Sequence, residues 1–500
     1  MNQSKPFSLT KSRFVKGKHC PKALYLHTYF RELQTPLTPS EEKNLAAGNE
    51  VGKAARKEFP NGILIETLDV EKALKETQEA ISKKALTLYE PAFRFNNHVI
   101  RIDILTRKTL NDPWDLYEVK ATTYNKKTKE QIEEYRQDIG FQVWLLKKLN
   151  IPLGKISLMH LNSECIYPDL NNLFICEDYS KEILPILSSM DNDLTNLEKT
   201  LLNSKEPNQS LGSCCEKPRG CQFKEYCWKN IPKPSLFNIP NCRKKWELYD
   251  RGLVSIDSLS LSDFTSEPHK RALECYKNNN RYFNTKAVTE LLSAYKSPLI
   301  FLDFESIDYP IPKFLNTRPY QHIPFQFSCH IQKEKEAVIE HFEFLFESKE
   351  DPRKAFVEAL TKTVPKTGSI IVYHQTYEKS RLKELLEAFP EYSDQLTNMI
   401  DRLVDLEEIF KKGIYDPKFL GSFSIKKVAP ALLGDKASYQ NLEISEGTQA
   451  SLAYKELIEL PPNSEEKKKL KQAMLEYCKQ DTLLMVKLHK WLSNKIKQGS

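Results

Sequence analysis

The stretch Ile300-Phe-Leu-Asp303-Phe-Glu305-Ser306 decides the fold of the second half of this sequence. Apolar residues flank two carboxylates, which predicts a buried strand, and such a strand tolerates charge only where a partner neutralises it. Because successive side chains of a strand alternate, Asp303 and Glu305 point to the same face. Oxygen ligands in this arrangement suit Mg²⁺ or Mn²⁺. The stretch therefore predicts part of a divalent metal site.

The same pair also has an ordinary interpretation. With 67 acids among 500 residues, composition alone gives roughly ten acid-x-acid triplets, most of them on solvated faces. The apolar setting of this triplet, and the acids that follow it, favour the metal site.

The second half continues with alternating segments at 324–331 and 337–346, a helical pattern at 352–363 and a strand at 369–374. The next helix carries Glu378. In the last helix Asp481 lies on the apolar stripe, four residues after Tyr477, where an acid is costly unless it is paired or binds metal. A structural salt bridge is the alternative.

Two further segments carry polar groups. The pattern from Asp401 to Asp405 predicts a helix with two acids. Lys426 and Lys427 are predicted to lie in a Gly/Ser turn where a phosphate group could bind, although a solvated loop explains them at least as well.

The first half follows an α-β-β-β-α-β order. Helical spacing covers 46–60 and 70–85, strand patterns cover 86–95, 98–106 and 114–122, and a helix at 129–148 precedes a strand at 155–160. Asp103 interrupts an apolar strand, and Glu118-x-Lys120 lies on the next one. Adjacent antiparallel strands would bring these groups together as a metal pair with a lysine beside an attacked phosphate.

A cross-strand salt bridge is the alternative for the Glu118-x-Lys120 triplet. On the following helix, Gln142 is a candidate contact to substrate or water near the same site.

Cysteines cluster at the end of the first half. Cys221 and Cys227 follow either Cys214 or Cys215 in a Gly/Pro-containing loop, and Cys20 supplies a fourth thiol. Thiolates at this spacing bind zinc or an iron–sulfur cluster, and spacing does not choose between them.

Length, charge and termini limit the possible classes. A chain of 500 residues suggests roughly two to four domains. A formal charge of +7 permits a polyanionic partner without requiring one. The first residues lack the apolar core of a signal peptide, and no segment has the roughly 18 apolar residues of a membrane span, so we expect a cytoplasmic protein. Eleven cysteines in such a chain argue against a disulfide framework.

The first half resembles the RecB-like PD-(D/E)XK nucleases, especially the CRISPR-associated and AddB-type exonucleases. The resemblance covers roughly residues 8–232 and is carried by Cys20-Pro, Asp103, Glu118-x-Lys120 and the three later cysteines. It implies a restriction-endonuclease-like fold and a [4Fe-4S] cluster on Cys20, Cys215, Cys221 and Cys227. The family's early histidine has no counterpart at 48–52, and its tyrosine four residues after Gln142 is replaced by Leu146.

The second half resembles the DEDDy exonucleases of the ribonuclease H-like fold over roughly residues 298–495. The resemblance implies that two divalent ions bind the acids and that the tyrosine orients the attacking water, roles that would fall on Asp303, Glu305, Glu378, Asp481 and Tyr477. The family usually has aspartate where Glu378 stands. The whole chain is similar to a group of bacterial proteins that fuse the two modules and share the stretch 318–328.

The sequence therefore predicts an α/β protein with a RecB-like domain at 1–232, a helical connector at 233–297 and a ribonuclease H-like domain at 298–500. The leading hypothesis is a metal-dependent exonuclease that degrades DNA from its ends. One alternative is an RNA exonuclease. Another is a nucleic-acid-binding component of a repair or defence complex, in which only the second module, or neither, is catalytic.

Overall fold

The computed structural model describes residues 7–123, 128–334 and 337–499 of a chain that folds into two units. Each unit combines helices with mixed β-sheets, which confirms the α/β class. The first unit comprises Met1–Asn230 and Tyr309–Gln321, and the second comprises Ile231–Asp308 and His322–Ser500. Residues 233–297, predicted to be a connector, thus lie in the second unit.

A six-stranded sheet of order β2-β3-β6-β7-β8-β9 forms the centre of the first unit. Its strand β7 pairs antiparallel with β6 and parallel with β8, while β1 and β4 flank β5 in a separate three-stranded sheet. The strands are β1 (Leu9–Thr10), β2 (Ile63–Leu64), β3 (Thr87–Tyr89), β4 (Ala92–Phe95), β5 (His98–Arg101), β6 (Ile104–Thr106), β7 (Trp114–Thr123), β8 (Leu153–Leu161) and β9 (Phe174–Asp178).

Helix α5 packs into the main core of the first unit. Thr128 and Gln131 form a capping box at its start, and its residues from Gln137 to Leu146 are all buried. Phe141 of this helix stacks on Phe14 of α1, with ring centroids 4.8 Å apart. The helices of the unit are α1 (Lys11–His19), α2 (Pro21–Tyr29), α3 (Pro39–Lys57), α4 (Val70–Ser82), α5 (Lys129–Lys148), α6 (Leu184–Leu202) and α7 (Lys224–Trp228).

Two predicted strands of the first unit are each divided in the structure. The segment 86–95 breaks between β3 and β4, where Glu90 adopts a φ of 57°. The segment 98–106 breaks between β5 and β6 at Ile102 and Asp103. Asp103 therefore stands at a strand end rather than within a continuous strand, where its side chain can turn towards β7.

A five-stranded sheet of order β13-β12-β11-β14-β15 forms the centre of the second unit, and β11 is its middle strand. β11 pairs antiparallel with β12 and parallel with β14. The strands are β11 (Leu299–Ile307), β12 (Ile323–Gln332), β13 (Ile339–Leu345), β14 (Ser369–Val372) and β15 (Leu403–Asp405), with a short separate pair of β10 (Tyr282–Phe283) and β16 (Ile414–Tyr415).

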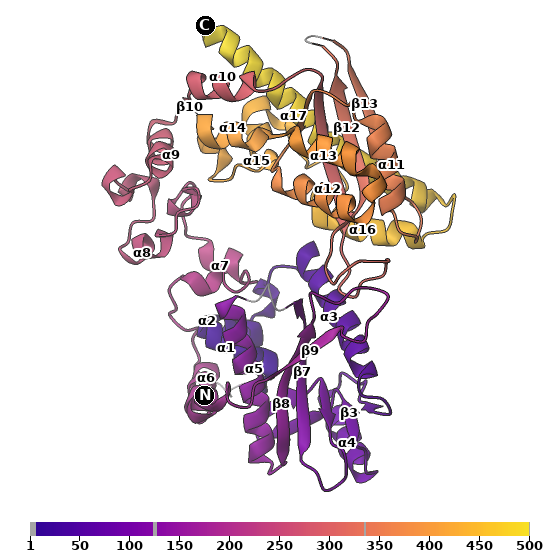
Figure 1. Cartoon of the computed structure of the whole chain (residues 1–500). Helices are drawn as coiled ribbons and strands as arrows, with labels where there is room; N and C mark the ends of the chain where they lie inside the picture. The colour runs from indigo at the N-terminus through magenta and orange to yellow at the C-terminus, as the bar shows by residue number, and fades with distance from the viewer. Residues whose placement is uncertain (1–6, 124–127, 335–336, 500) are drawn as a thin grey trace. The chain divides into compact units, whose positions relative to one another are not determined.

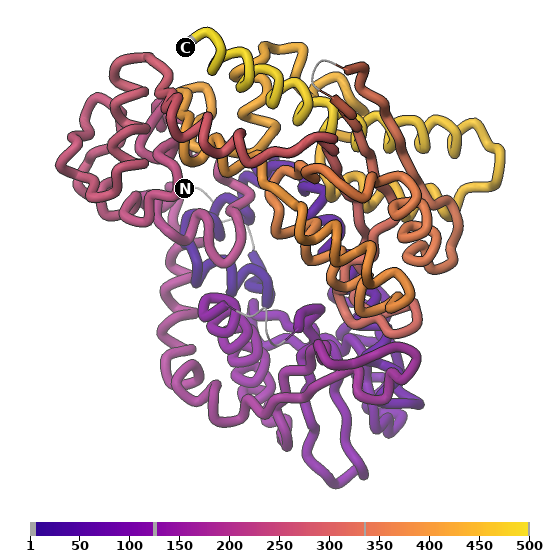
Figure 2. Tube along the Cα trace, turned by 45° about the horizontal axis from the view of Figure 1, so that its top comes forward, coloured from indigo at the N-terminus to yellow at the C-terminus, as the bar shows by residue number. Residues whose placement is uncertain are grey.

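The helices of the second unit cover both faces of this sheet (Figure 1). Ile300, Leu302 and Phe304 alternate along β11 and join a core with α11, α12 and α13. The long helix α17 contacts β11 and β12, and it can be followed as one continuous helix in Figure 2. The helices are α8 (Lys245–Asp250), α9 (Glu267–Asn278), α10 (Thr285–Ser293), α11 (Arg353–Thr363), α12 (Thr376–Ala388), α13 (Ser393–Asp401), α14 (Leu406–Gly413), α15 (Ile425–Leu433), α16 (Gly447–Glu459) and α17 (Glu465–Gly499).

Two local predictions for the second unit are wrong. The segment from Asp401 to Asp405 is not one helix, because α13 ends at Asp401 and β15 begins at Leu403. Lys426 and Lys427 do not lie in a loop, since they occupy the first turn of α15. In the segment 401–405 only a few residues carry the pattern, so helix and strand periodicities are hard to distinguish.

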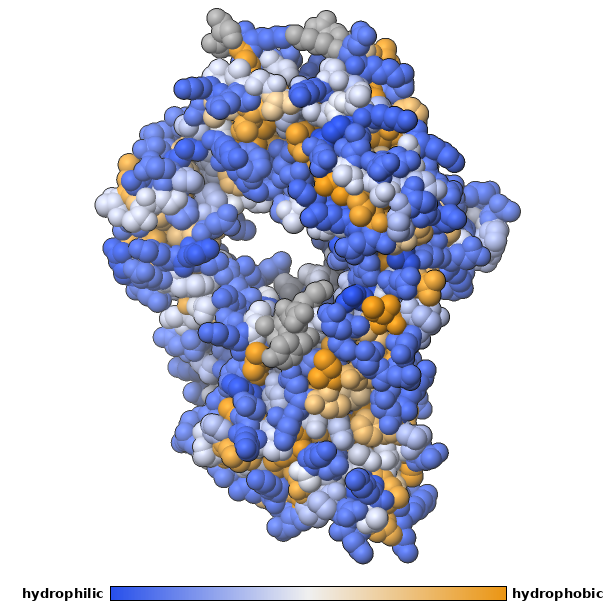
Figure 3. Space-filling model, viewed as in Figure 1, coloured by the Kyte–Doolittle hydropathy of each residue, from blue (hydrophilic) through white to orange (hydrophobic). Residues whose placement is uncertain are grey.

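Among the described residues, no helix is both long and apolar enough to cross a membrane. Figure 3 shows one face of the molecule, where hydrophilic residues predominate and hydrophobic ones form small separate patches.

Candidate metal and nucleic-acid sites

Strand β11 presents Asp303 and Glu305 to one side of the second unit's sheet, as predicted. Their neighbours Leu302 and Phe304 point into the opposite core. Glu305 is only 7% exposed. The strand thus carries two carboxylates on the face that α17 covers.

Helix α17 brings Tyr477, Cys478 and Asp481 to the same place. All three side chains are buried, and the Cys478 thiol lies 3.7 Å from Oδ2 of Asp303. One turn further on, Thr482 lies 2.7 Å from the Ser328 hydroxyl of β12. The helix is therefore fixed against the sheet at the height of the acids.

Glu378 comes from α12 and is only 2% exposed. Its Oε2 atom is buried, and none of the described residues supplies a hydrogen-bond partner for it. A buried carboxylate oxygen without a donor is costly, so this atom fits a cation better than an apolar surrounding.

The four acids influence one another's ionisation. Burial, and then the neighbouring Asp481, raise the pKa of Asp303 and of Glu305 well above their ordinary values. Burial raises the pKa of Glu378 to about 8 and that of Asp481 to about 6. Like charges held this close in a poorly solvated place favour binding of a divalent cation.

Potential ligand atoms of Asp303, Glu305 and Cys478 all lie within 4.8 Å of one another. The two carboxylates suit Mg²⁺ or Mn²⁺, whereas the thiol is a softer ligand and its pKa is raised by burial and by Asp303. Asp303 and Glu305, with the acids from α12 and α17, therefore offer an oxygen-rich set that fits a hard divalent ion.

Lys426 and Tyr439 complete this site. The Lys426 ammonium donates to the Tyr477 hydroxyl over 3.2 Å and to the Ser445 carbonyl over 2.6 Å. The Tyr439 hydroxyl donates to Oδ1 of Asp481. Sequence reasoning missed Tyr439 because it lies in a segment without periodicity. Lys427 is exposed and is absent from the cavity described next.

A cavity of about 650 Å³ opens onto this site. It is lined by the acids Asp303, Glu305, Glu407 and Asp481 and by two lysines, Lys426 and Lys411. The Lys411 ammonium donates to Oε2 of Glu407 over 2.7 Å. A cavity with acids at one place and ammonium groups nearby suits an anionic ligand that is bound together with a cation.

Asp405 organises the wall of the cavity next to α12. Its carboxylate accepts hydrogen bonds from the backbone N–H groups of His374, Gln375 and Glu407, at 3.1, 3.0 and 2.9 Å. His374 has a φ of 70°, and its ring lies 3.1 Å from Oε2 of Glu407. Asp405 thus fixes the turn that begins α12, four residues before Glu378.

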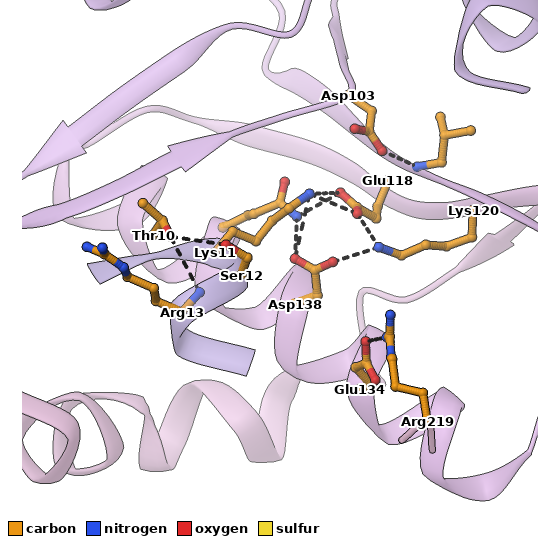
Figure 4. Close-up of polar contacts among 12 residues, drawn as sticks. Thr10, Lys11, Ser12, Arg13, Asp103, Glu118, Lys120, Glu134, Asp138 and Arg219 are labelled. Atoms are coloured by element: carbon orange, nitrogen blue, oxygen red, sulfur yellow. Dashed lines mark hydrogen bonds and ion pairs between the residues drawn. The ribbon is translucent and has the colours of Figure 1, made fainter. Parts of the chain in front are cut away.

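The predicted acids of the first unit also come together, around Glu118 on β7 (Figure 4). Lys120 donates to Oε1 of Glu118 over 2.5 Å and to Oδ2 of Asp138 over 2.7 Å. Oδ2 of Asp103 accepts from the backbone N–H of Val119 over 2.6 Å. The structure therefore adds Asp138 to the predicted group.

Two further residues bond to Glu118. Lys11 reaches both of its carboxylate oxygens, and Gln142 donates to Oε2 over 2.8 Å. Gln142 is fully buried and also bonds to Asp138, so the structure does not place it on a substrate-facing surface. Lys11 was not predicted, because a lysine at a helix start near other lysines is usually solvated.

Charge is unevenly distributed in this first site. Lys11 and Lys120 hold the pKa of Glu118 well below its ordinary value against the effect of burial. Burial and the Glu118 charge raise the pKa of Asp103 to about 7. Asp103 also lines a separate cavity of about 360 Å³ with Glu90 and Arg56.

The cysteine group forms where the start of the first unit meets the 213–228 segment. Cys20 caps α2, and its thiol accepts from the backbone N–H of Ala23 over 3.4 Å. Cys20, Cys221 and Cys227 all pack against Phe223 and its apolar neighbours. The N–H of Cys221 donates to the carbonyl of Cys215 over 3.0 Å.

The thiols of these four cysteines and of Cys214 are free and half-buried. Burial, and then Cys215 and Cys20, raise the pKa of Cys214 to about 12. Burial raises the pKa of Cys227 to about 11, with Cys221 and Cys20 among the further causes. Thiols that oppose one another's ionisation fit a shared metal centre. Among the described residues, no three of these sulfur atoms lie within 4.8 Å of one another.

Two comparisons with known proteins bear on this chain. A family model described as a domain of unknown function, DUF2779, matches residues 300–424, which include β11 and α12 but not α17. A protein of Ureaplasma parvum serovar 3 with the name "Uncharacterized protein UU173" is 29% identical over 200 residues. That match covers 36% of this chain and 27% of the relative, so the chain is similar to about a quarter of that protein's length.

Proposed function

We propose that this protein is a metal-dependent nuclease whose main catalytic site comprises Asp303, Glu305, Glu378 and Asp481 of the second unit. The observation that carries the proposal is the convergence of four acids from three elements in poorly solvated surroundings, with a buried oxygen of Glu378 that lacks a donor among the described residues. Burial of mutually repelling acids is costly, and a bound cation offsets that cost.

Each protein group has a role in this proposal. The acids would hold divalent ions, which when bound polarise a phosphodiester and lower the pKa of a water molecule. Burial, and then Glu305, hold the pKa of Tyr477 far above its ordinary value, so its side chain is a neutral phenol. Because Lys426 donates to the phenol oxygen, the Tyr477 hydrogen is available to orient a water molecule or a phosphate oxygen.

The substrate class follows from charge and from resemblance. A cavity that combines acids with Lys411 and Lys426 suits a phosphate bound through a cation. The central position of β11 in a five-stranded sheet supports a ribonuclease H-like domain, and the DEDDy resemblance implies removal of nucleotides from 3′ ends with 5′-phosphate products. We propose DNA as the substrate, with RNA as the alternative.

The direct test uses end-labelled single- and double-stranded DNA and RNA with Mg²⁺ or Mn²⁺. We expect Asp303→Asn to reduce degradation by about 10²-fold or more, since a metal ligand contributes several kcal/mol to the transition state. The control is Asp394→Asn, which changes an exposed acid of α13 and is expected to leave the rate unchanged.

The outcomes separate the alternatives. Activity that persists in a combined Asp303→Ala and Lys120→Ala protein would contradict the proposal. Activity that survives Lys120→Ala and is lost on Asp303→Ala would favour a first unit that does not cut and serves as a nucleic-acid clamp. Retained affinity for nucleic acid without hydrolysis would instead favour a binding component of a repair or defence complex.

We further propose that the cysteine group holds a [4Fe-4S] cluster through Cys20, Cys221, Cys227 and either Cys214 or Cys215. Gathering of thiols from two distant segments supports a shared centre, and the RecB-like resemblance implies iron. Anaerobically purified protein is expected to be brown and to lose iron on Cys221→Ser. Colourless protein that contains zinc would contradict this proposal.

A further inference from the structure

The ammonium group of Lys11 sits on both carboxylate oxygens of Glu118. The Lys11 Nζ atom lies 2.9 Å from Oε1 and 3.1 Å from Oε2 of Glu118, and 3.7 Å from Oδ1 of Asp138 (Figure 4). Lys11 is 107 residues from Glu118 in sequence and is the first residue of α1. The chain therefore places its own cation on the acid that the RecB-like resemblance makes a metal ligand.

The hydrogen bonds to Glu118 use all of its acceptor positions. An ionised carboxylate offers about four lone-pair positions. Lys11 and Lys120 donate to Oε1, and Lys11 and Gln142 donate to Oε2. A divalent ion can bind Glu118 only if one of these donors leaves.

Lys11 is the donor best able to leave. Gln142 is fully buried and is also bonded to Asp138. Lys120 is held by a second contact of 2.7 Å to Asp138. The closest approach of Lys11 to that acid is longer, at 3.7 Å, while the exposed fractions of the two lysine side chains are similar, 24% for Lys11 and 22% for Lys120. Its backbone is fixed at the start of α1 while its side chain has four rotatable bonds.

We propose that Lys11 is an internal counter-ion that closes the acidic site of the first unit, and that a divalent ion binds there only when the Lys11 ammonium withdraws from Glu118. This inference rests on the proposed function and adds to it a control of metal binding in the first unit by Lys11. With Lys11 in place, its ammonium group and that of Lys120 stand against the three carboxylates of Asp103, Glu118 and Asp138. The site then carries a net charge of −1 if all three acids are ionised. With Lys11 withdrawn, one ammonium remains and the excess negative charge matches a divalent ion.

The proposal distinguishes the two sites. In the second unit Glu378 has a buried oxygen that no described residue satisfies, whereas in the first unit every oxygen of Glu118 has a donor. The second site is thus ready for metal and the first is closed at rest. A released Lys11 ammonium would also be available to a phosphate of bound nucleic acid.

The test measures Mn²⁺ binding to the full chain in which Asp303→Asn and Asp481→Asn inactivate the second site. Free Mn²⁺ is followed by electron paramagnetic resonance. We expect Lys11→Met to tighten binding at the first site by about tenfold or more, because a competing cation is removed. Lys18→Met is the control, since Lys18 lies on the same helix but pairs with Asp193 at 2.9 Å.

Unchanged or weaker Mn²⁺ binding in the Lys11→Met protein would overturn the proposal. If that variant does not fold, the second measurement is amine labelling of the chain with Lys11 intact, read by mass spectrometry. Labelling of Lys11 is expected to rise severalfold with saturating Mn²⁺ while labelling of Lys18 stays constant. Labelling of Lys11 that stays constant or falls would also overturn it. Both measurements report metal at the first site, so their failure is distinct from a lack of hydrolysis by the second.

Discussion

Burial of the Glu378 carboxyl group makes its ionised form costly in the folded protein. Its pKa of about 8 in the folded protein exceeds the ordinary value of 4.5. The stability that its neutral form contributes is present below pH 4.5 and is lost as the pH rises to about 8. The free energy of unfolding of the metal-free protein should therefore be lower at pH 8 than at pH 5 by the amount that neutral Glu378 contributes.

We predict that Glu378→Gln stabilises the metal-free protein at pH 8 by about 1–3 kcal/mol while it lowers hydrolysis by about 10²-fold. The gain should shrink towards pH 5, because the native carboxyl is then neutral as well. Urea denaturation in EDTA at the two pH values measures the gain. Glu387→Gln, which changes an exposed acid of the same helix, is the control. A gain that is equal at both pH values would contradict the assignment.

Some site residues could be predicted because their pattern is incompatible with a solvated face. Asp303 and Glu305 interrupt an apolar strand at a period of two, and Asp481 interrupts an apolar helical stripe. Lys11 and Tyr439 gave no such signal. Only the tertiary fold brings each of them to its acid. Lys11 is 107 residues from Glu118 in sequence, and Tyr439 is 42 residues from Asp481.

At the scale of elements, α15 depends on the turn that precedes it. Gly421 has a φ of 82°, and a Cβ atom there would lie 2.4 Å from the carbonyl oxygen of Asn238. Only glycine fits both the backbone and the space. The turn in this form places Lys426 next to Tyr477.

We predict that Gly421→Ala destabilises the protein by about 2–4 kcal/mol through the left-handed backbone and the overlap with Asn238. Hydrolysis should also fall, because Lys426 moves with the start of α15. Gly434→Ala at the other end of the helix is the matched control, since Gly434 has a φ of 87° but open space around its Cα. It should cost less than Gly421→Ala, about 1–3 kcal/mol from the strained backbone alone. Equal losses of stability in the two variants, measured by urea denaturation, would disprove the role of Asn238.

Helix α17 carries a second titrating group far along its length. His489 stacks on Tyr295 with ring centroids 6.0 Å apart and meets Phe301 edge-on. Burial lowers the pKa of His489 to about 4 from 6.5. Between these values the unfolded chain binds a proton that the folded chain does not, so the stability that His489 contributes is complete above pH 6.5 and is lost as the pH falls towards 4.

We predict that His489→Leu reduces the fall in Tm between pH 6.5 and pH 4 relative to the unsubstituted protein. Comparison of the two proteins cancels the opposite trend of the buried acids. Thermal denaturation followed by circular dichroism gives the slope of Tm against pH for each protein. Equal slopes would show that His489 is protonated in the folded state over this range.

Elements with strong periodicity were predicted best. The helix at Lys129–Lys148 agrees with α5 at both ends, since a capping residue precedes it and lysines end it. Breaks within strands were missed at Glu90 and at Ile102 and Asp103, because one or two residues outside the strand pairing do not change the hydropathy pattern. The segment from Asp401 to Asp405 is too short to distinguish a strand from a helix.

At the scale of the whole molecule, the chain passes between its two units three times. Residues Tyr309–Gln321 leave the second unit after β11 and belong to the first. Within the first unit, Ile311 and Tyr320 pack in a cluster with Val51 and Leu161, and the Tyr320 hydroxyl donates to the Ala121 carbonyl over 2.7 Å. The sequence predicted boundaries at 232/233 and 297/298 and not the return of 309–321 to the first unit, because contacts between residues so far apart in sequence leave no local pattern.

We predict that a fragment of residues 1–230 is less stable than the same fragment joined by a flexible linker to residues 309–321. The difference should be about 2–4 kcal/mol, as for the loss of one or two buried side chains. Urea denaturation of the two fragments measures it, with a linker that ends in a scrambled 309–321 segment as the control. Equal midpoints for the three fragments would show that the segment adds nothing to the fold.

This exchange of segments also sets an order for synthesis on the ribosome. When Asn230 has been made, the first unit still lacks the segment that completes one of its apolar clusters, and Gln321 follows about ninety residues later. At a usual elongation rate the interval is roughly 5 to 20 s. During that time the first unit exists as a nearly finished nascent domain, and its final packing waits for the chain to make the strand that carries Asp303.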